Sequence, residues 1–148
     1  MWPEAGKGHM MIRGWRVALV GTANNDEYGE LVVPTMEAVG SREDLVGIVT
    51  LGKREARLPS SVVVPENARV LDYVPYHAVL SMANVFVFNG GYGGLMHGVM
   101  SGVPMVIAGT AADKGEVAAR AEWAGIAINL RTESVNCQGC EVAIKLDC

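Results

Sequence analysis

The sequence predicts an α/β fold in which a Rossmann-like parallel sheet is covered by helices on both faces. Six short runs rich in Val, Ile and Leu alternate with segments of helical character. The runs are apolar at consecutive positions and do not alternate with polar residues, which is typical of parallel strands buried on both faces. The expected strands are residues 16–20, 45–50, 68–71, 85–88, 105–108 and 126–130.

Length and composition indicate one folded domain. The 148 residues are enough to bury roughly two thirds of the unfolded surface. Half of the residues are apolar and 19% are charged, as in a globular protein. We expect a flexible leader over residues 1–15, the folded domain over 16–132 and an irregular tail over 133–148.

Charge and hydropathy argue against several classes of function. The formal net charge is −4 and the Lys and Arg residues are scattered, so the chain lacks the basic patch of a nucleic-acid or anionic-membrane binder. No apolar run approaches the roughly 18 residues that span a bilayer, and residues 1–15 lack the apolar core of a signal peptide. Without targeting signals or a disulfide framework, a cytoplasmic protein is expected.

Caps and breakers set the expected helices. Asn25 or Asp26 can cap a first helix that runs to about residue 39, and Pro34 predicts a kink or a restart inside it. Further helices are expected over residues 76–82, 92–101 and 114–124, with Gly102 suited to the position after a helix end. Three valines at 62–64 favour a brief additional strand.

The turn after the strand at 85–88 is the most informative stretch. Residues 89–94 read NGGYGG, and a helix is expected from Tyr92. Free N–H groups and the positive end of the helix dipole meet at such a turn, and the missing Cβ atoms let an anion approach the backbone. The glycines do not fit GxGxxG, so a ligand other than NAD is considered first.

Other candidate residues follow neighbouring strands. In an open parallel sheet, ligands lie outside the carboxyl ends of the strands, so the candidate turns are 21–22, 73–74, 89–94 and 109–114. His97 lies on the same helical face as Gly93 and Gly94, within reach of a ribose hydroxyl. A surface or filler histidine is an equal alternative without any family argument.

The same turns carry an ordered set of short motifs. They are YVP at 73–75, NGGYGG at 89–94, GVPM at 102–105, GT at 109–110, DK at 113–114 and AGI at 124–126. Together they resemble the donor-binding half of the UDP-glycosyltransferases, in their microbial and fungal branch, over roughly residues 16–132. The resemblance implies half of a GT-B fold, in which two Rossmann-like domains face a cleft. It implies a UDP-sugar as co-substrate, with no further cofactor and no metal.

The resemblance assigns roles to individual residues. Tyr73 matches the aromatic ring that stacks on uracil, and Val74 matches the position whose backbone meets the base edge. Residues expected around the diphosphate are Gly21, Thr22, Gly91, Gly93 and Gly94.

Three positions depart from the family pattern. His97 stands where many members have a ribose-binding Glu, and Asn89 stands at a common diphosphate histidine. An amide donates a neutral hydrogen bond, so the helix dipole would supply most of the anion stabilisation. Asp113 and Lys114 replace an Asp-Gln pair that binds sugar hydroxyls; Asp113 can still accept, and Lys114 can donate to the sugar or to phosphate.

Simpler interpretations stand beside these roles. Tyr73 alone is more often a packing residue and Asp113 alone a helix cap. Cys137, Cys140 and Cys148 resemble part of a zinc site, or a redox CxxC, but no histidine lies near them in sequence to complete a metal site, so incidental cysteines are favoured. No G-x-S-x-G elbow supports a hydrolase.

The leading hypothesis is transfer of a hexose from a UDP-sugar to a hydroxyl of a small apolar acceptor, such as a secondary metabolite or a lipid-like molecule. In the family, the histidine base and the acceptor pocket lie in an N-terminal domain that has no counterpart here, so we expect a truncated form without a catalytic residue of its own. One alternative is a non-catalytic nucleotide-sugar-binding subunit that works with a separate acceptor-domain protein. Another is an inactive remnant.

Overall fold

The structure is a computed structural model that describes residues 16–21, 28–111 and 113–132, with the backbone alone for 16–20. Its strands are β1 Arg16–Gly21, β2 Leu45–Thr50, β3 Ala68–Leu71, β4 Val85–Phe88, β5 Met105–Ile107 and β6 Ala127–Asn129. Its helices are α1 Val32–Gly40, α2 Tyr76–Leu80, α3 Tyr92–Ser101 and α4 Lys114–Trp123. All six expected strands form, and each end lies within one residue of its expected position.

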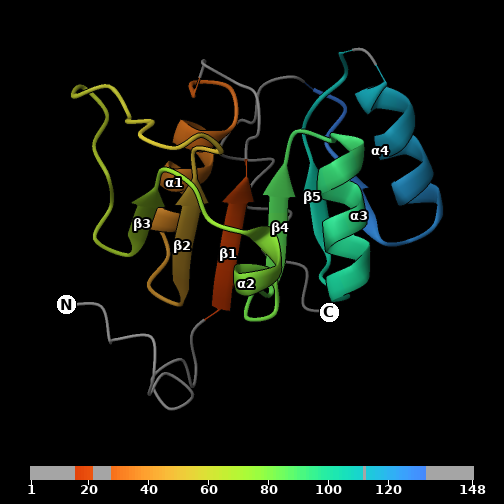
Figure 1. Ribbon diagram of the computed structural model, residues 1–148, viewed down its shortest axis with the longest axis horizontal. Helices are drawn as coiled ribbons and strands as arrows, with labels where there is room; N and C mark the ends of the chain where they lie inside the picture. The colour runs from red at the N-terminus through yellow and green to blue at the C-terminus, as the bar shows by residue number, and fades with distance from the viewer. Residues whose placement is uncertain (1–15, 22–27, 112, 133–148) are drawn as a thin grey trace.

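The six strands form one parallel sheet in the order β3-β2-β1-β4-β5-β6. The chain builds outward from β1 to β3, returns to the other side of β1, and then builds β4 to β6 (Figure 1). The connections that follow β1 and β4 therefore run in opposite directions along the sheet. Such a switch point is where an open α/β sheet leaves a crevice at its carboxyl edge. The arrowheads in Figure 1 mark that edge, and α3 begins there.

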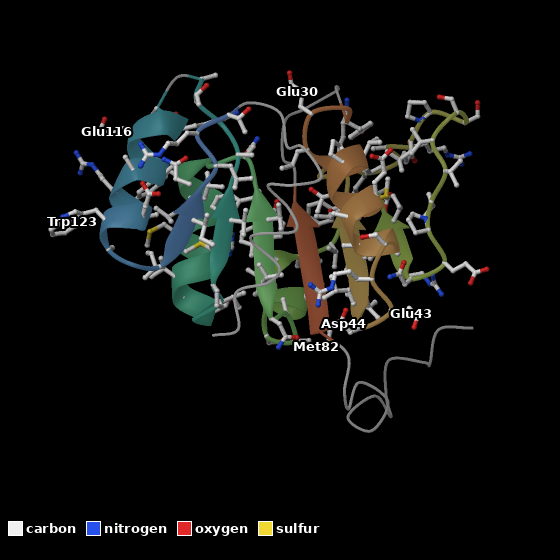
Figure 2. The ribbon with its side chains drawn as sticks, turned by 180° about the vertical axis from the view of Figure 1, so that it is seen from behind. Glu30, Glu43, Asp44, Met82, Glu116 and Trp123 are labelled. Atoms are coloured by element: carbon white, nitrogen blue, oxygen red, sulfur yellow. The ribbon has the colours of Figure 1, made fainter. Side chains whose placement is uncertain are left out.

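Helices cover both faces of the sheet, as expected. Alternate residues of β4 point to opposite faces: Val87 joins the core cluster beneath α1, whereas Phe86 and Phe88 join the cluster beneath α2, α3 and α4. Figure 1 shows α2 and α3 in front of the sheet, and Figure 2, from behind, shows α1 on the other face. Both faces of the central strands are thus buried, which is why their sequences read as unbroken apolar runs.

The first helix differs from its prediction. It begins at Val32, after a turn at residues 28–31, and not at a cap on Asn25 or Asp26, which lie outside the described residues. Pro34 therefore falls in the first turn, where its missing N–H has no helical partner in any case, and neither a kink nor a restart is needed. The helix buries one side against the sheet, with Met36 and Val39 each 1% exposed.

Residues 62–64 form no strand, so that prediction is wrong. Val62 closes a turn by donating its N–H to Pro59, Val63 is 85% exposed, and Pro65 has no N–H to offer a strand ladder. The expected leader (1–15), the expected tail (133–148) and its three cysteines lie outside the described residues. Within the described part of the chain, none of the helices has the length and apolar character needed to cross a bilayer.

Candidate functional site

The turn between β4 and α3 has the backbone geometry of an anion site. Gly90 takes a φ of +86°, a left-handed conformation that favours glycine. The Asn89 side-chain Oδ1 accepts the N–H of Gly91 at 3.3 Å, and Gly91 caps the helix without a side chain. The first helical bond runs from the N–H of Leu95 to the carbonyl of Gly91. Among the described residues, nothing accepts the N–H groups of residues 92–94, which lie at the positive end of the helix dipole.

Packing explains some glycines of this region but not Gly93. A Cβ on Gly94 would lie 2.8 Å from the ring of Phe88, so the helix could not lie as close to the sheet with a side chain there. Within the described part of the chain, a Cβ on Gly93 would meet nothing within 4 Å. Because a helical Cβ tilts toward the N-terminus of its helix, the bare Gly93 leaves open space next to the free N–H groups.

The loops that follow β4 and β5 are in main-chain contact. A Cβ on Gly109 would lie 2.0 Å from the backbone oxygen of Asn89, so no other residue fits there without moving one of the loops. A Cβ on Gly90 would similarly lie 2.8 Å from Ile107. This contact fixes the position of α4, whose first residue is Lys114, relative to the turn at residues 89–94, which we call the anion turn.

Lys114 brings a positive charge to this region. Its Cδ lies 3.3 Å from the Cβ position of Gly109 and its own Cβ lies 3.5 Å from that of Gly90, so its methylene stem runs beside the turn. No acidic partner is recorded for its ammonium group within residues 28–111 and 113–132. The neighbouring Asp113 is exposed and is the N-cap residue of α4, as the simpler interpretation expects, but its side chain makes no capping hydrogen bond.

Tyr76 lies at the switch point, and sequence reasoning missed it. Its hydroxyl oxygen is 2.5 Å from the Cβ position of Gly21, the last residue of β1. Its ring packs edge-on against Phe86 and His97, with centroids 5.3 and 5.4 Å away. Burial, with a smaller effect from nearby Tyr73, raises the pKa of Tyr76 to about 12. In the sequence, Tyr76 comes shortly after the candidate turn at residues 73–74. This position, now seen to be the first residue of α2, is the signal that could have identified it.

The remaining predicted residues are placed as follows. Tyr73 follows β3 and is 49% exposed, while Val74 is half-buried against the cluster beneath α2 to α4. His97 is exposed and lies against Tyr76. The structure thus brings one group together around the anion turn and a second group around Tyr76. Thr22 lies outside the described residues.

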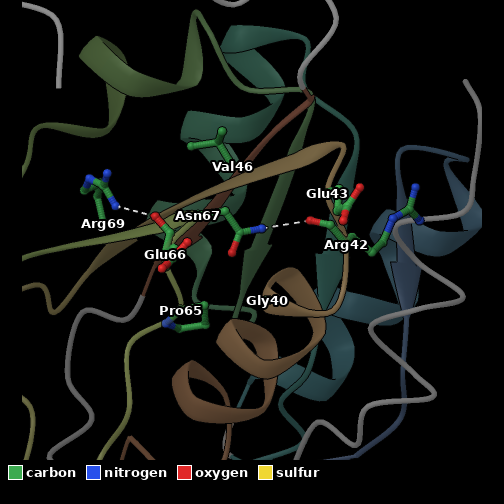
Figure 3. Close-up of a pocket in the computed structure, with 8 residues that line it drawn as sticks. All are labelled: Gly40, Arg42, Glu43, Val46, Pro65, Glu66, Asn67 and Arg69. Carbon is green, nitrogen blue, oxygen red and sulfur yellow. Dashed lines mark hydrogen bonds between the residues drawn. The ribbon is translucent and has the colours of Figure 1, made fainter. Parts of the chain in front are cut away.

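A hollow of about 630 Å³ lies at the opposite edge of the sheet, near the amino ends of β2 and β3 (Figure 3). Its central Asn67 donates from Nδ2 to the carbonyls of Val39, Arg42 and Leu45, at 2.8 to 3.0 Å. The polar groups here hold the chain together, so the carboxyl edge remains the better candidate. Within the described residues, no three His, Cys, Asp or Glu side chains gather as a metal site would require.

A parallel sheet with a glycine-rich helix start at its switch point is the architecture of many nucleotide-binding α/β domains. Residues 35–146 match the family described as erythromycin biosynthesis protein CIII-like, C-terminal domain, and the chain belongs to this family of glycosyltransferase C-terminal domains. The resemblance found in the sequence is thereby confirmed.

Individual relatives agree with this family. UDP-glucosyltransferase 1 of Beauveria bassiana (strain ARSEF 2860) is 53% identical over 105 residues, which are 71% of this chain and 23% of that protein. UDP-glucosyltransferase B1 of Starmerella bombicola is 41% identical over 145 residues, 97% of this chain and 32% of that protein. The solved glycotransferase of kitacinnamycin superposes with a TM-score of 0.76 at 29% identity, covering 97% of this chain and 38% of that chain. The chain therefore spans about a quarter to a third of the length of its curated relatives.

Proposed function

We propose that this chain binds the UDP-sugar donor of a glycosyl transfer at the carboxyl edge of its sheet. The observation that carries the proposal is the start of α3, where three N–H groups have no partner within the described residues and the stem of Lys114 runs beside the turn. Such a helix start binds phosphate groups, and two curated relatives carry the name UDP-glucosyltransferase.

In the proposed complex, each group of the donor has a partner. Uracil stacks on Tyr73, and the diphosphate lies at the start of α3, where Asn89 has an amide in place of a cationic side chain. Lys114 supplies the full positive charge, because α3 itself contains no Lys or Arg. The carboxylate of Asp113, which makes no capping hydrogen bond to α4, accepts hydrogen bonds from sugar hydroxyls.

The first experiment is calorimetric titration of the full chain with UDP, UDP-glucose and NADH. We expect saturable binding of both uridine nucleotides and much weaker binding of NADH. The assignment would be abandoned if UDP did not bind, or if NADH bound as well as UDP.

A Lys114 variant tests the charge that the proposal gives to the diphosphate. We expect Lys114→Met to weaken the binding of UDP by about tenfold, which corresponds to about 1.4 kcal/mol. The binding of UMP should weaken less, because UMP lacks the second phosphate. Lys53→Met, in an exposed loop after β2, is the matched control for loss of one positive charge. Equal losses for UDP and UMP would contradict this role of Lys114.

We further propose that the transferred sugar is a hexose and that the acceptor is a small apolar molecule with a hydroxyl. The part played by this chain is to position the donor and to stabilise the leaving diphosphate, and the base that activates the acceptor comes from an acceptor-binding half. The chain alone should then bind UDP-glucose without transferring it, whereas addition of an acceptor-binding half should restore transfer. Recovery of a stable acceptor-domain partner in a pull-down would favour the alternative of a two-chain enzyme.

A further inference from the structure

The ring of Tyr73 has a cation on one of its faces. The guanidinium carbon of Arg54 lies 5.8 Å from the ring centroid, within the range of a cation–π interaction. Arg54 is exposed, and within the described part of the chain no hydrogen bond or ion pair holds its guanidinium. Tyr73 nevertheless keeps 49% of its surface exposed, which leaves area for a ligand to contact.

Asp72 holds the loop that carries Arg54. One carboxylate oxygen accepts the N–H of Glu55 at 2.8 Å, and the other accepts the N–H of Tyr73 at 2.7 Å. The backbone oxygen of Asp72 also accepts the N–H of Lys53 at 3.1 Å. The residues on both sides of Arg54 are therefore tied to the residue that precedes Tyr73.

This connection has a conformational cost. Glu55 takes a φ of 65°, a left-handed conformation that is unfavourable for a residue with a side chain. Its N–H bond to Asp72 offsets the cost, and the bonds from Glu55 and Tyr73 lower the pKa of the Asp72 carboxyl below its ordinary value. The loop thus holds a defined conformation that places a guanidinium above an aromatic ring.

We propose that Arg54 is a positioning residue for the nucleotide base, so that guanidinium, Tyr73 ring and base form a stack of three layers. The inference rests on the proposed binding of a uridine nucleotide and adds a residue that acts on it through Tyr73. A guanidinium suits this position because it is planar, weakly hydrated and stacks on aromatic faces. It limits the rotation of the exposed ring before the base arrives, which lowers the entropic cost of binding.

The test is a double-mutant cycle read by calorimetric titration with UDP and with inorganic pyrophosphate, which has no base. Arg54→Ala should weaken UDP by about two- to fivefold, as expected for an exposed cation–π pair, and leave pyrophosphate unchanged. Tyr73→Ala should weaken UDP by at least about fivefold. In the Tyr73→Ala background, Arg54→Ala should have no further effect, since the residue through which Arg54 acts is gone.

Two further variants separate stacking from charge. Arg57→Ala removes the same charge from the same exposed segment, away from the Tyr73 contact, and should bind UDP like the original chain. Arg54→Lys keeps a cation without the planar group and should restore only part of the affinity.

The inference is overturned if UDP binds and Arg54→Ala leaves its affinity unchanged. It is also overturned if the effects of Arg54→Ala and Tyr73→Ala on UDP affinity are additive. The same holds if Arg54→Ala weakens the binding of pyrophosphate as much as the binding of UDP. Failure of the unaltered chain to bind UDP would instead overturn the proposed function itself.

Discussion

At the scale of single residues, the anion turn depends on side chains that are small or absent. Gly109 permits main-chain contact with Asn89, and Gly94 permits contact with Phe88, so both serve packing. Gly93 has no such packing role, because a Cβ there would meet nothing within 4 Å among the described residues. A substitution at Gly93 can therefore test the proposed ligand contact separately from packing.

Gly93→Ala should therefore weaken UDP binding without destabilising the fold. The added methyl group tilts toward the helix N-terminus, where the diphosphate is proposed to lie. We expect a loss in affinity of about tenfold or more, with an unchanged or slightly raised Tm because alanine favours helix. Calorimetric titration and thermal unfolding give the two readouts. Met100→Ala, exposed near the other end of α3, is the control and should change neither. Unaltered affinity in Gly93→Ala would argue against a ligand at this turn.

The raised pKa of Tyr76 predicts how the stability of the chain depends on pH. Its pKa of about 12 in the folded chain exceeds the ordinary value of 10.0, so the unfolded chain loses this proton first as the pH rises. The contribution to stability is complete below pH 10 and is lost as the pH rises toward 12. In a titration followed by the ultraviolet absorbance of tyrosinate, one of the four tyrosines should ionise late, and Tyr76→Phe should remove that late component. Simultaneous ionisation of all four would contradict the burial of Tyr76.

At the scale of elements, Asn67 joins three parts of the chain at the amino edge of the sheet. Its amide group donates to the end of α1 at Val39, to the following turn at Arg42 and to the start of β2 at Leu45. Figure 3 shows this side chain at the centre of the hollow. One side chain thus fixes how α1 returns to the sheet.

Asn67→Asp tests this junction with almost no change in size. A carboxylate cannot donate and would face carbonyl oxygens, so the free energy of unfolding should fall by about 2–4 kcal/mol. Asn67→Ala should cost less, because it leaves the carbonyls unpaired without adding a charge. Urea unfolding measures both variants. UDP affinity of the folded protein should be unchanged, since the junction lies at the edge opposite the candidate site. An Asp variant as stable as the original chain would show that the junction is not important.

The sequence predicts well whatever depends on neighbours along the chain. Apolar runs located all six strands, and the glycines located the start of α3 and its end at Gly102. The contact of Tyr76 with His97 and the path of the Lys114 stem depend on how separate βα units pack, so no local pattern shows them. The start of α1 was misplaced because two cap-forming residues precede a proline that tolerates only the first turn.

At the scale of the whole molecule, the strand order brings both parts of the candidate site to one edge. β1 and β4 are adjacent although α1, β2, β3 and α2 separate them in the sequence. Tyr73, the proposed contact of the base, comes from the β3 side, and Lys114 comes from the β5 side. A ligand that contacts both would couple the two halves of the sheet.

UDP should therefore raise the Tm of the chain. A ligand at 100 times its Kd adds about 2.7 kcal/mol to the free energy of unfolding, which corresponds to about 8 °C for a domain of this size. Uridine, which carries the base without phosphate, should give a much smaller shift at the same concentration. Thermal unfolding at several UDP concentrations measures the effect, and a Tm independent of UDP would contradict binding to the folded chain.

The absence of Lys and Arg from α3 affects how the affinity for UDP should depend on salt concentration. In the proposed complex, the backbone N–H groups of the turn contact the diphosphate directly, and such short-range hydrogen bonds are little affected by screening with a Debye length of about 8 Å. In the proposed site, Lys114 adds one mobile charge, so the affinity for UDP should fall only slowly as salt is added, in contrast to the steep fall of proteins that bind nucleic acids through many cationic side chains. A donor site built in this way would hold its nucleotide almost equally well in dilute and in concentrated cell fluid.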